Sequence, residues 1–159
     1  MKKETAPYEQ EFKLWVMLEQ AQSAIFAARE KELAQFGISP MKAAVLFIVK
    51  NIGSEATPTE IARWILRKSH TVSGLLDRME KDGLITKAKN LPKKNLVRVT
   101  ITPKGQKALR QAMKREYIRR IFAAIPGRDR TQLYNQLEKL RDKGLKLSGF
   151  PKPPYPESL

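Results

Sequence analysis

The stretch that decides the fold is residues 57–105, TPTEIARWILRKSHTVSGLLDRMEKDGLITKAKNLPKKNLVRVTITPKG. Thr57, with Glu60 three residues later, forms a capping box, and the proline between them suits the first turn of a helix. Ser69 is expected to be the N-cap of a second helix, which ends at Gly83. The sequence therefore predicts two short helices separated by a brief turn.

The second helix is predicted to have two chemically different sides. Its apolar residues repeat at i, i+3, i+4 and i+7, so this side should pack inward; they are Val72, Leu75, Leu76 and Met79. The opposite, solvent side carries His70, Ser73, Gly74 and Asp77. Ser69 and Thr71 stand with His70 and Ser73 on the first turns of the helix. Such a helix can rest on a protein core and still present polar groups to a partner.

A β-hairpin is predicted to follow, with strands at 84–89 and 96–102. Apolar residues occupy every second position of the second strand, which is the period of a half-buried strand. The turn at 90–95 contains Lys93 and Lys94. Two short helices followed by a basic hairpin are typical of a winged helix-turn-helix, a module that places one helix in the major groove of DNA.

Charge is concentrated on this stretch. The chain has 31 Lys and Arg against 16 Asp and Glu, a formal net charge of +15. Residues 57–107 hold 12 basic and 4 acidic residues, a net of +8, which leaves +7 for the other 108 residues. A basic excess focused on one motif favours a polyanionic partner over a generally basic surface.

Several classes of protein and site are disfavoured. The chain has no cysteine and a single histidine, so disulfides, thiol redox sensing and the common zinc sites are excluded, and no cofactor or metal is expected. Ser69 and His70 adjoin, but helix neighbours point about 100° apart, and no phosphate-binding glycine loop occurs, so the chain is not expected to be an enzyme. Neither a membrane span nor a signal peptide is evident, which makes a cytoplasmic location the expectation.

The flanking sequence is mostly helical. Helices are predicted at 8–36, from Pro40 to about Gly53, from Pro103 as one long helix to Pro126, and from about Asp129 to the end of the leucine repeat. The resulting fold class is mainly α with a small β-hairpin (α+β). The proline-rich tail, 149–159, is expected to be an extended end, with a polyproline II ligand as the less favoured alternative.

The first and last helices carry more apolar surface than a small basic lobe could cover. A second copy of the chain is the simplest cover, and the alternative is that these helices close over their own domain. The predicted organisation is a helical dimerisation region at 1–37 and 107–148, a DNA-binding lobe at 38–106, and the tail at 149–159.

DNA contacts are expected from the second helix, its flanks and the hairpin. Short polar side chains on the first helical turns can approach base edges, whereas flanking cations suit phosphates. The predicted DNA-binding residues are Arg67, Lys68, Ser69, His70, Thr71, Ser73, Gly74, Arg78, Lys93, Lys94, Asn95 and Arg98.

Over nearly its whole length the chain resembles the MarR family of bacterial transcriptional regulators. The resemblance is carried by Ile61-Ala62, by Ser69, Thr71, Val72 and Ser73, by LDRMEKDGLI at 76–85, and by ITPKG at 101–105. It implies an obligate homodimer with interleaved terminal helices, a pseudo-palindromic operator in double-stranded DNA, and most often repression.

The hairpin tip departs from that family. Members usually carry an Asp-Arg-Arg-like or Asp-x-Arg tip, in which an arginine enters the minor groove and the aspartate orients it. Here the positions hold Lys93, Lys94 and Asn95, so the charge is kept and the planar fork is lost. We expect a more electrostatic contact from this wing.

The resemblance also implies a small aromatic or anionic effector, bound between the lobe and the dimer helices. Candidate residues for such a crevice are Trp15, Phe26, Phe36, Phe47 and Trp64, with Arg29 or Arg63 facing an anion. Aromatic residues at helical spacing are more often core, so no effector residue is assigned from sequence. A non-catalytic module that binds RNA or a protein stays the alternative function.

Overall fold

The structure is a computed structural model, and it describes residues 7–89 and 96–156. Along the chain the elements are α1 (Pro7–Ala34), α2 (Pro40–Ile52), a 3-10 turn η1 (Gly53–Glu55), α3 (Pro58–Trp64), α4 (Ser69–Lys81), β1 (Ile85–Lys89), β2 (Val97–Ile101), α5 (Pro103–Ala112), α6 (Glu116–Phe122) and α7 (Gly127–Ser148). The expected mainly helical fold with one small hairpin is confirmed. Within the described ranges, no helix combines the length and apolar character needed to cross a bilayer.

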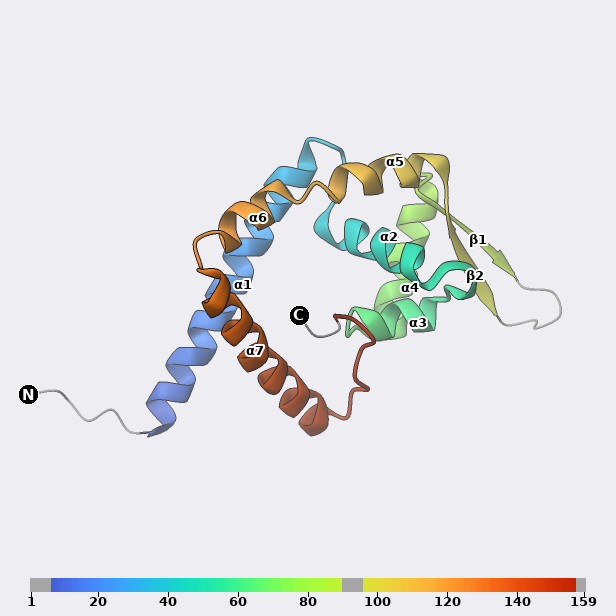
Figure 1. Cartoon of the computed structure of the whole chain (residues 1–159). Coiled ribbons are helices and arrows are strands. Elements are labelled where there is room, and N and C mark those ends of the chain that lie inside the picture. Colours follow the sequence, from blue (N-terminus) through green and yellow to red (C-terminus); the bar gives the residue numbers. More distant parts are fainter. Residues whose placement is uncertain (1–6, 90–95, 157–159) are drawn as a thin grey trace, which may run out of the picture.

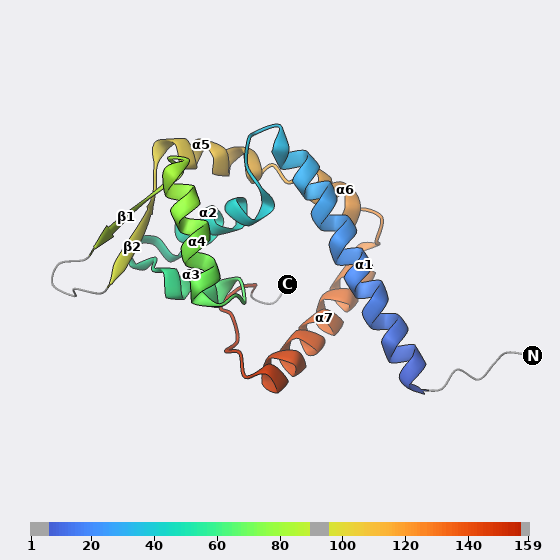
Figure 2. The same cartoon turned by 180° about the vertical axis from the view of Figure 1, so that it is seen from behind.

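The elements form two groups (Figures 1 and 2). The lobe consists of α2, η1, α3, α4, the hairpin and α5, whereas the frame consists of α1, α6 and α7. Two chain connections join the groups, one between α1 and α2 and the other between α5 and α6. The lobe thus projects from the frame at the end of α5 and presents the hairpin at its far side.

One hydrophobic core holds the lobe together. Apolar faces of α2, α3 and α4 meet there, closed by the hairpin and by α5. Its most deeply buried large side chains are Leu33, Leu46, Ile61, Leu76, Met79, Ile85 and Leu109. The predicted inward side of the second helix is confirmed, since Val72, Leu75, Leu76 and Met79 are all buried.

The hairpin is antiparallel, and its register runs from Ile85 opposite Ile101 to Lys89 opposite Val97. It is tied to the rest of the lobe by a backbone hydrogen bond, in which Val99 N–H donates to the Ala56 carbonyl at 2.9 Å. The hairpin is therefore packed as part of the lobe.

Two glycines set the path from α4 into the hairpin and α5. Gly83 has a φ of 72°, a left-handed conformation that suits glycine, and it reverses the chain after α4. Gly105 lies against the Leu84 backbone and the Ile101 side chain, so closely that a Cβ atom would overlap both. The start of α5 can pack on the hairpin only because this position has no side chain.

The frame leaves much apolar surface uncovered in the single chain. The exposed large side chains of α1 are Tyr8, Phe12, Leu14, Trp15, Val16, Met17, Leu18 and Phe26. Those of α7 are Leu137, Leu140 and Leu147. The alternative that these helices close over their own domain is not what the fold shows.

The single long helix predicted from Pro103 to Pro126 is wrong. It is divided at Arg115, whose φ of 51° is left-handed, so α5 ends at Ala112 and α6 begins at Glu116. The reason lies far away in sequence, because α1 supplies hydrogen-bonding groups to both new helix ends. Arg29 donates to the Ala112 carbonyl at 2.5 Å, and Glu32 accepts from Tyr117 N–H at 3.3 Å.

The helix starts agree with the predictions except in two places. Ser39 and Thr57 cap α2 and α3 as expected, since each accepts from the backbone N–H three residues later. Ser69 is not the N-cap of α4 but its first residue; Lys68 is the cap, without a side-chain bond. The last helix starts at Gly127, two residues before the predicted Asp129.

Candidate nucleic-acid interface

The helix α4 lies on the lobe with its polar side turned outward. Its backbone start is set by the turn after α3, where Leu66 has a left-handed φ of 53° and Arg67 N–H donates to the Ala62 carbonyl at 3.0 Å. The predicted contact residues of this helix are all exposed: Ser69, His70, Thr71, Ser73, Gly74 and Arg78. We call the first five of these residues the polar face of α4.

The polar face is made of small groups. Ser73 Oγ donates to the Ser69 carbonyl at 3.1 Å, which turns the hydroxyl back along its own helix. Around Gly74, a Cβ atom would meet nothing within 4 Å. A surface of this kind lets a partner approach the backbone closely, as the floor of a DNA groove would.

Cations frame the polar face. Arg67 and Lys68 are exposed just before α4, and Arg78 is exposed on its third turn. In the described part of the chain, none of the three has a carboxylate within ion-pair distance. Their charges are therefore available to phosphates, which such residues contact without reading sequence.

The acidic residues of this region are engaged by neighbouring lysines. Lys87 of β1 pairs with Asp77 and lies 3.5 Å from Glu80 Oε2, and the hydrogen bond to Asp77 raises the pKa of Lys87. Lys42 Nζ lies 2.6 Å from Asp82 Oδ2, and this bond lowers the pKa of Asp82. These pairs were not anticipated from sequence, since the lysines lie on other elements.

The wing, which is the hairpin formed by β1 and β2, is described except for residues 90–95. Arg98, predicted to contact DNA, is half-buried on β2, with a guanidinium nitrogen 3.8 Å from Glu55 Oε1. Lys93, Lys94 and Asn95 lie outside the described residues. The hairpin is nevertheless placed on the same lobe as the polar face of α4 (Figure 1).

A cavity of about 340 Å³ lies where the lobe meets the frame. Its lining is mostly apolar and draws on α1, α2, α5, α6 and the tail. Among the lining residues, Arg29, Phe47, Arg115 and Tyr155 supply charge or aromatic surface. Arg115 lies over the Phe47 ring, with Cζ 5.4 Å from the ring centroid.

The residues suggested for an aromatic crevice are divided by the structure. Phe47 and Arg29 do line the cavity, but Arg29 is held in an ion pair with Glu32. The others lie elsewhere. Trp15 is exposed, Phe26 lines a different cavity on the frame, and Arg63 lies 3.8 Å from Glu60. Phe36 and Trp64 pack on the core. Sequence reasoning missed Arg115 and Tyr155, which come from the helix break and the tail.

Comparisons with known proteins agree with this geometry. A sequence model described as MarR family matches residues 36–94. A relative in Bacillus subtilis (strain 168), the uncharacterized HTH-type transcriptional regulator YsmB, is 25% identical over 122 residues, which are 75% of this chain and 83% of the relative.

Solved structures resemble the chain over most of its length. The crystal structure of the organohalide sensing transcriptional regulator RdhR, ligand-free, is 32% identical with a TM-score of 0.85, and the match covers 99% of this chain and 98% of that one. Its 2,4-dichlorophenol-bound form gives the same values. A mutant MarR from E. coli complexed with operator DNA shares the fold alone, at 16% identity and a TM-score of 0.77 over 86% of this chain and 99% of that one.

Proposed function

Because the chain belongs to the MarR family of winged helix-turn-helix transcriptional regulators, we propose that it is a homodimeric repressor that binds a pseudo-palindromic operator. Repression here means that the bound dimer blocks access to a promoter. Such a protein acts where the DNA is, in the cytoplasm, and catalyses no reaction.

The observation that carries this proposal is the polar face of α4, which is exposed and framed by cations that have no ion-pair partner among the described residues. In the proposed complex, Ser69, His70 and Ser73 face base edges in the major groove. Arg67, Lys68 and Arg78 bind phosphates on either side. Lys93 and Lys94 of the wing neutralise phosphates of the DNA backbone beside the adjacent minor groove.

The uncovered apolar surface of the frame supports the proposed dimer. Tyr8 is 80% exposed and Phe12 66% exposed, in a helix of 28 residues that a single chain leaves bare along much of its length. Patches of this kind mark interfaces. We assign dimerisation to 1–37 and 107–148 and DNA binding to 38–106; twofold symmetry then spaces two recognition helices by roughly 34 Å, one DNA turn.

A small aromatic anion is the proposed effector, and the cavity between lobe and frame is its proposed site. The cavity is lined by elements of both groups, so an occupant would contact the lobe and the frame together. Arg115 is the favoured cation, because Arg29 is committed to Glu32 and to the Ala112 carbonyl. In support, one of the similar regulators has been solved with 2,4-dichlorophenol bound.

Selection from random duplex DNA, followed by anisotropy titrations over a range of salt concentrations, tests the proposal. We expect a site with two related halves, bound by two chains, and an affinity that falls steeply with salt. The matched comparison is double-stranded RNA of the selected sequence. Equal affinity for both duplexes would contradict operator binding and favour a general nucleic-acid module.

A further inference from the structure

The C-terminal tail returns to the lobe instead of pointing away from it (Figures 1 and 2). Gly149, with a left-handed φ of 74°, ends α7 and turns the chain. Residues 149–156, which we call the strap, then run across to the lobe near α3. Within the strap Pro153 is buried, although most of its neighbours are exposed.

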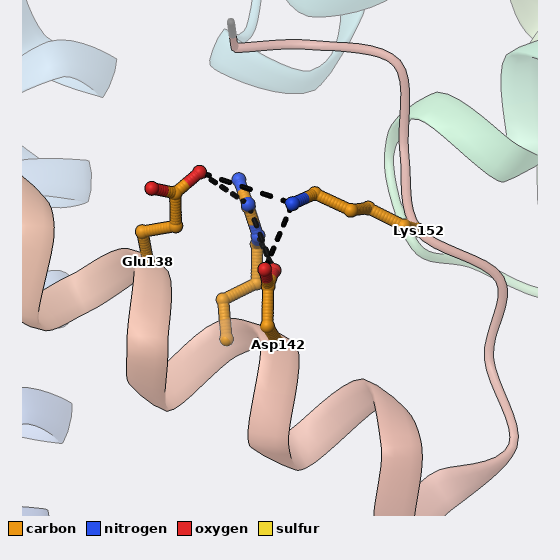
Figure 3. A network of polar contacts seen from close by, with 4 residues as sticks. Glu138, Asp142 and Lys152 are labelled. Carbon is orange, nitrogen blue, oxygen red and sulfur yellow. Dashed lines mark hydrogen bonds and ion pairs between the residues drawn. The ribbon is translucent and has the colours of Figure 1, made fainter. Parts of the chain in front are cut away.

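The root of the strap is fixed to α7 by charge (Figure 3). Lys152 Nζ lies 2.8 Å from Asp142 Oδ2 and 3.9 Å from Glu138 Oε1. Arg141 pairs with the same two carboxylates, at 2.8 Å from Asp142 and 3.1 Å from Glu138. The bonds from Lys152 and Arg141 lower the pKa of Asp142. Lys152, held between two carboxylates, restricts the positions of the strap residues that follow it.

The tip of the strap is docked on aromatic rings of the lobe. The Tyr155 ring lies parallel to the Trp64 ring, with an interplanar angle of 7° and 6.1 Å between centroids. It also meets the Phe47 ring edge-on, at 5.3 Å and 62°. Both geometries are favourable for aromatic pairs. One side chain of the tail thus contacts two helices of the lobe, α2 and α3.

Tyr155 also belongs to the lining of the cavity between lobe and frame. The cavity of about 340 Å³ is present with the Tyr155 ring in place, so the ring lines the cavity without filling it. Phe47 and Arg115 line the same cavity. Tyr155 is 46% exposed, which leaves part of its surface free for contact.

We propose that Tyr155 is a ligand-contacting residue, carried by the strap to form the closing wall of the effector cavity. The inference rests on the proposed function, in which an aromatic anion occupies that cavity. The ligand lies in the cavity against the rings of Phe47 and Tyr155, which contact each other edge-on, with its negative group toward Arg115. Because the strap is rooted on α7, the occupant then links the frame to the lobe through this wall.

The test is calorimetric titration of the full-length protein with 2,4-dichlorophenol and with 2,4-dichlorobenzoate. Loss of one aromatic contact is worth about 0.5–1.5 kcal/mol, so Tyr155→Ala should weaken binding by about two- to ten-fold. Tyr155→Phe is the matched control, since it keeps the ring and should bind as the wild type does. Lys152→Ala, which frees the root of the strap, should weaken binding by less than Tyr155→Ala.

A second measurement needs no ligand. In a Trp15→Phe background, Trp64 is the one remaining tryptophan, because the chain has two. Removing Tyr155 uncovers one face of the indole, so acrylamide quenching should rise by roughly two-fold in Tyr155→Ala and stay unchanged in Tyr155→Phe. Equal quenching in all three would show that the strap is not docked and would overturn the proposal.

The titrations can also overturn it directly. Tighter binding by Tyr155→Ala would make the ring a competitor of the ligand. Unchanged binding would remove it from the site. If neither probe binds the wild type while operator binding is intact, the ligand site fails and the DNA-binding function stands. Loss of operator binding in the wild type would instead contradict the proposed function itself.

Discussion

Arg29 and Glu32, one turn apart on α1, form an ion pair with 2.5 Å between Nη1 and Oε2, and their side chains are 14% and 5% exposed. Each also reaches beyond its own helix. Arg29 donates to the Ala112 carbonyl, and Glu32 accepts from Tyr117 N–H. This pair therefore holds α1 to both sides of the break between α5 and α6, where the lobe leaves the frame.

Glu32→Gln should lower the free energy of unfolding by about 1–3 kcal/mol. The substitution leaves the largely buried guanidinium of Arg29 without its negative partner. Urea denaturation at neutral pH measures this. Arg29→Met and the double variant complete a mutant cycle, in which the double variant should cost less than the sum of the two. Additive costs would mean that the two side chains act independently.

The same carboxylate should make stability depend on pH. Burial alone raises the pKa of Glu32, but the hydrogen bonds from Arg29 and Tyr117 outweigh it and hold the pKa below its ordinary value of 4.5. A depressed pKa contributes stability above the ordinary value, and that stability is lost as pH falls through the folded-state pKa. Urea denaturation at a series of acidic pH values should show the wild type converging on Glu32→Gln; parallel curves would contradict this.

The break at Arg115 could not be predicted from the local sequence pattern, because the groups that bond to its two ends come from a distant segment. The residues between α5 and α6 are Met-Lys-Arg, which are good helix formers, so continuous helix was the reasonable prediction. The break depends on Arg29 and Glu32, more than 80 residues away. By contrast, the sidedness of α4 was predictable, because the spacing of Val72 to Met79 is a property of the segment itself.

Ser73→Glu should reduce operator affinity on the order of 100-fold, because a carboxylate on the polar face of α4 would meet phosphates and base acceptors in the groove. Ser73 is exposed, so the fold and the oligomeric state should be unchanged. Anisotropy with the selected operator measures affinity, and light scattering measures the oligomer. Ser73→Ala is the matched control and should bind within a few-fold of wild type. Full binding by Ser73→Glu would place the recognition surface elsewhere.

Changing Lys93 and Lys94 to Ala should weaken binding to all DNA sequences by a similar factor, because these charges neutralise phosphates and read no bases. The slope of log affinity against log salt should fall by roughly 1 to 2 per site. Titrations of the operator and of a scrambled duplex at several salt concentrations measure both effects. A loss confined to one base step of the operator would instead indicate that the wing reads sequence.

Gly105→Ala should destabilise the protein by about 3 kcal/mol or more, because the new Cβ would overlap the Leu84 carbonyl and the Ile101 side chain, and backbone cannot move aside cheaply. Thermal unfolding measures the loss. Gly144→Ala is the control, since a Cβ there meets nothing within 4 Å in the single chain, and alanine should stabilise α7 by about 0.5–1 kcal/mol. Equal stability of the two variants would show that the contact at Gly105 is not tight.

The candidate site, like the fold, has parts that a local sequence pattern predicts and parts that depend on contacts between distant segments. The exposed polar positions within residues 67–78 could be predicted from sequence because the motif is contiguous, and their contact with DNA stays a prediction. The ion pairs of Lys42 and Lys87 could not, since each lysine meets a carboxylate from another element. Tyr155 was hidden most completely, because a proline-rich chain end gives no indication of the surface it will meet.

The strap changes how the lobe can move. The lobe is attached to the frame by the connection from α1 to α2 and by the turn at Arg115, both near one edge of the lobe (Figure 1). The contact of Tyr155 with Trp64 on α3 adds a further attachment, which lies away from these two connections. In the proposed dimer each chain would carry its own strap, so the contact between strap and lobe would be made twice, once in each chain.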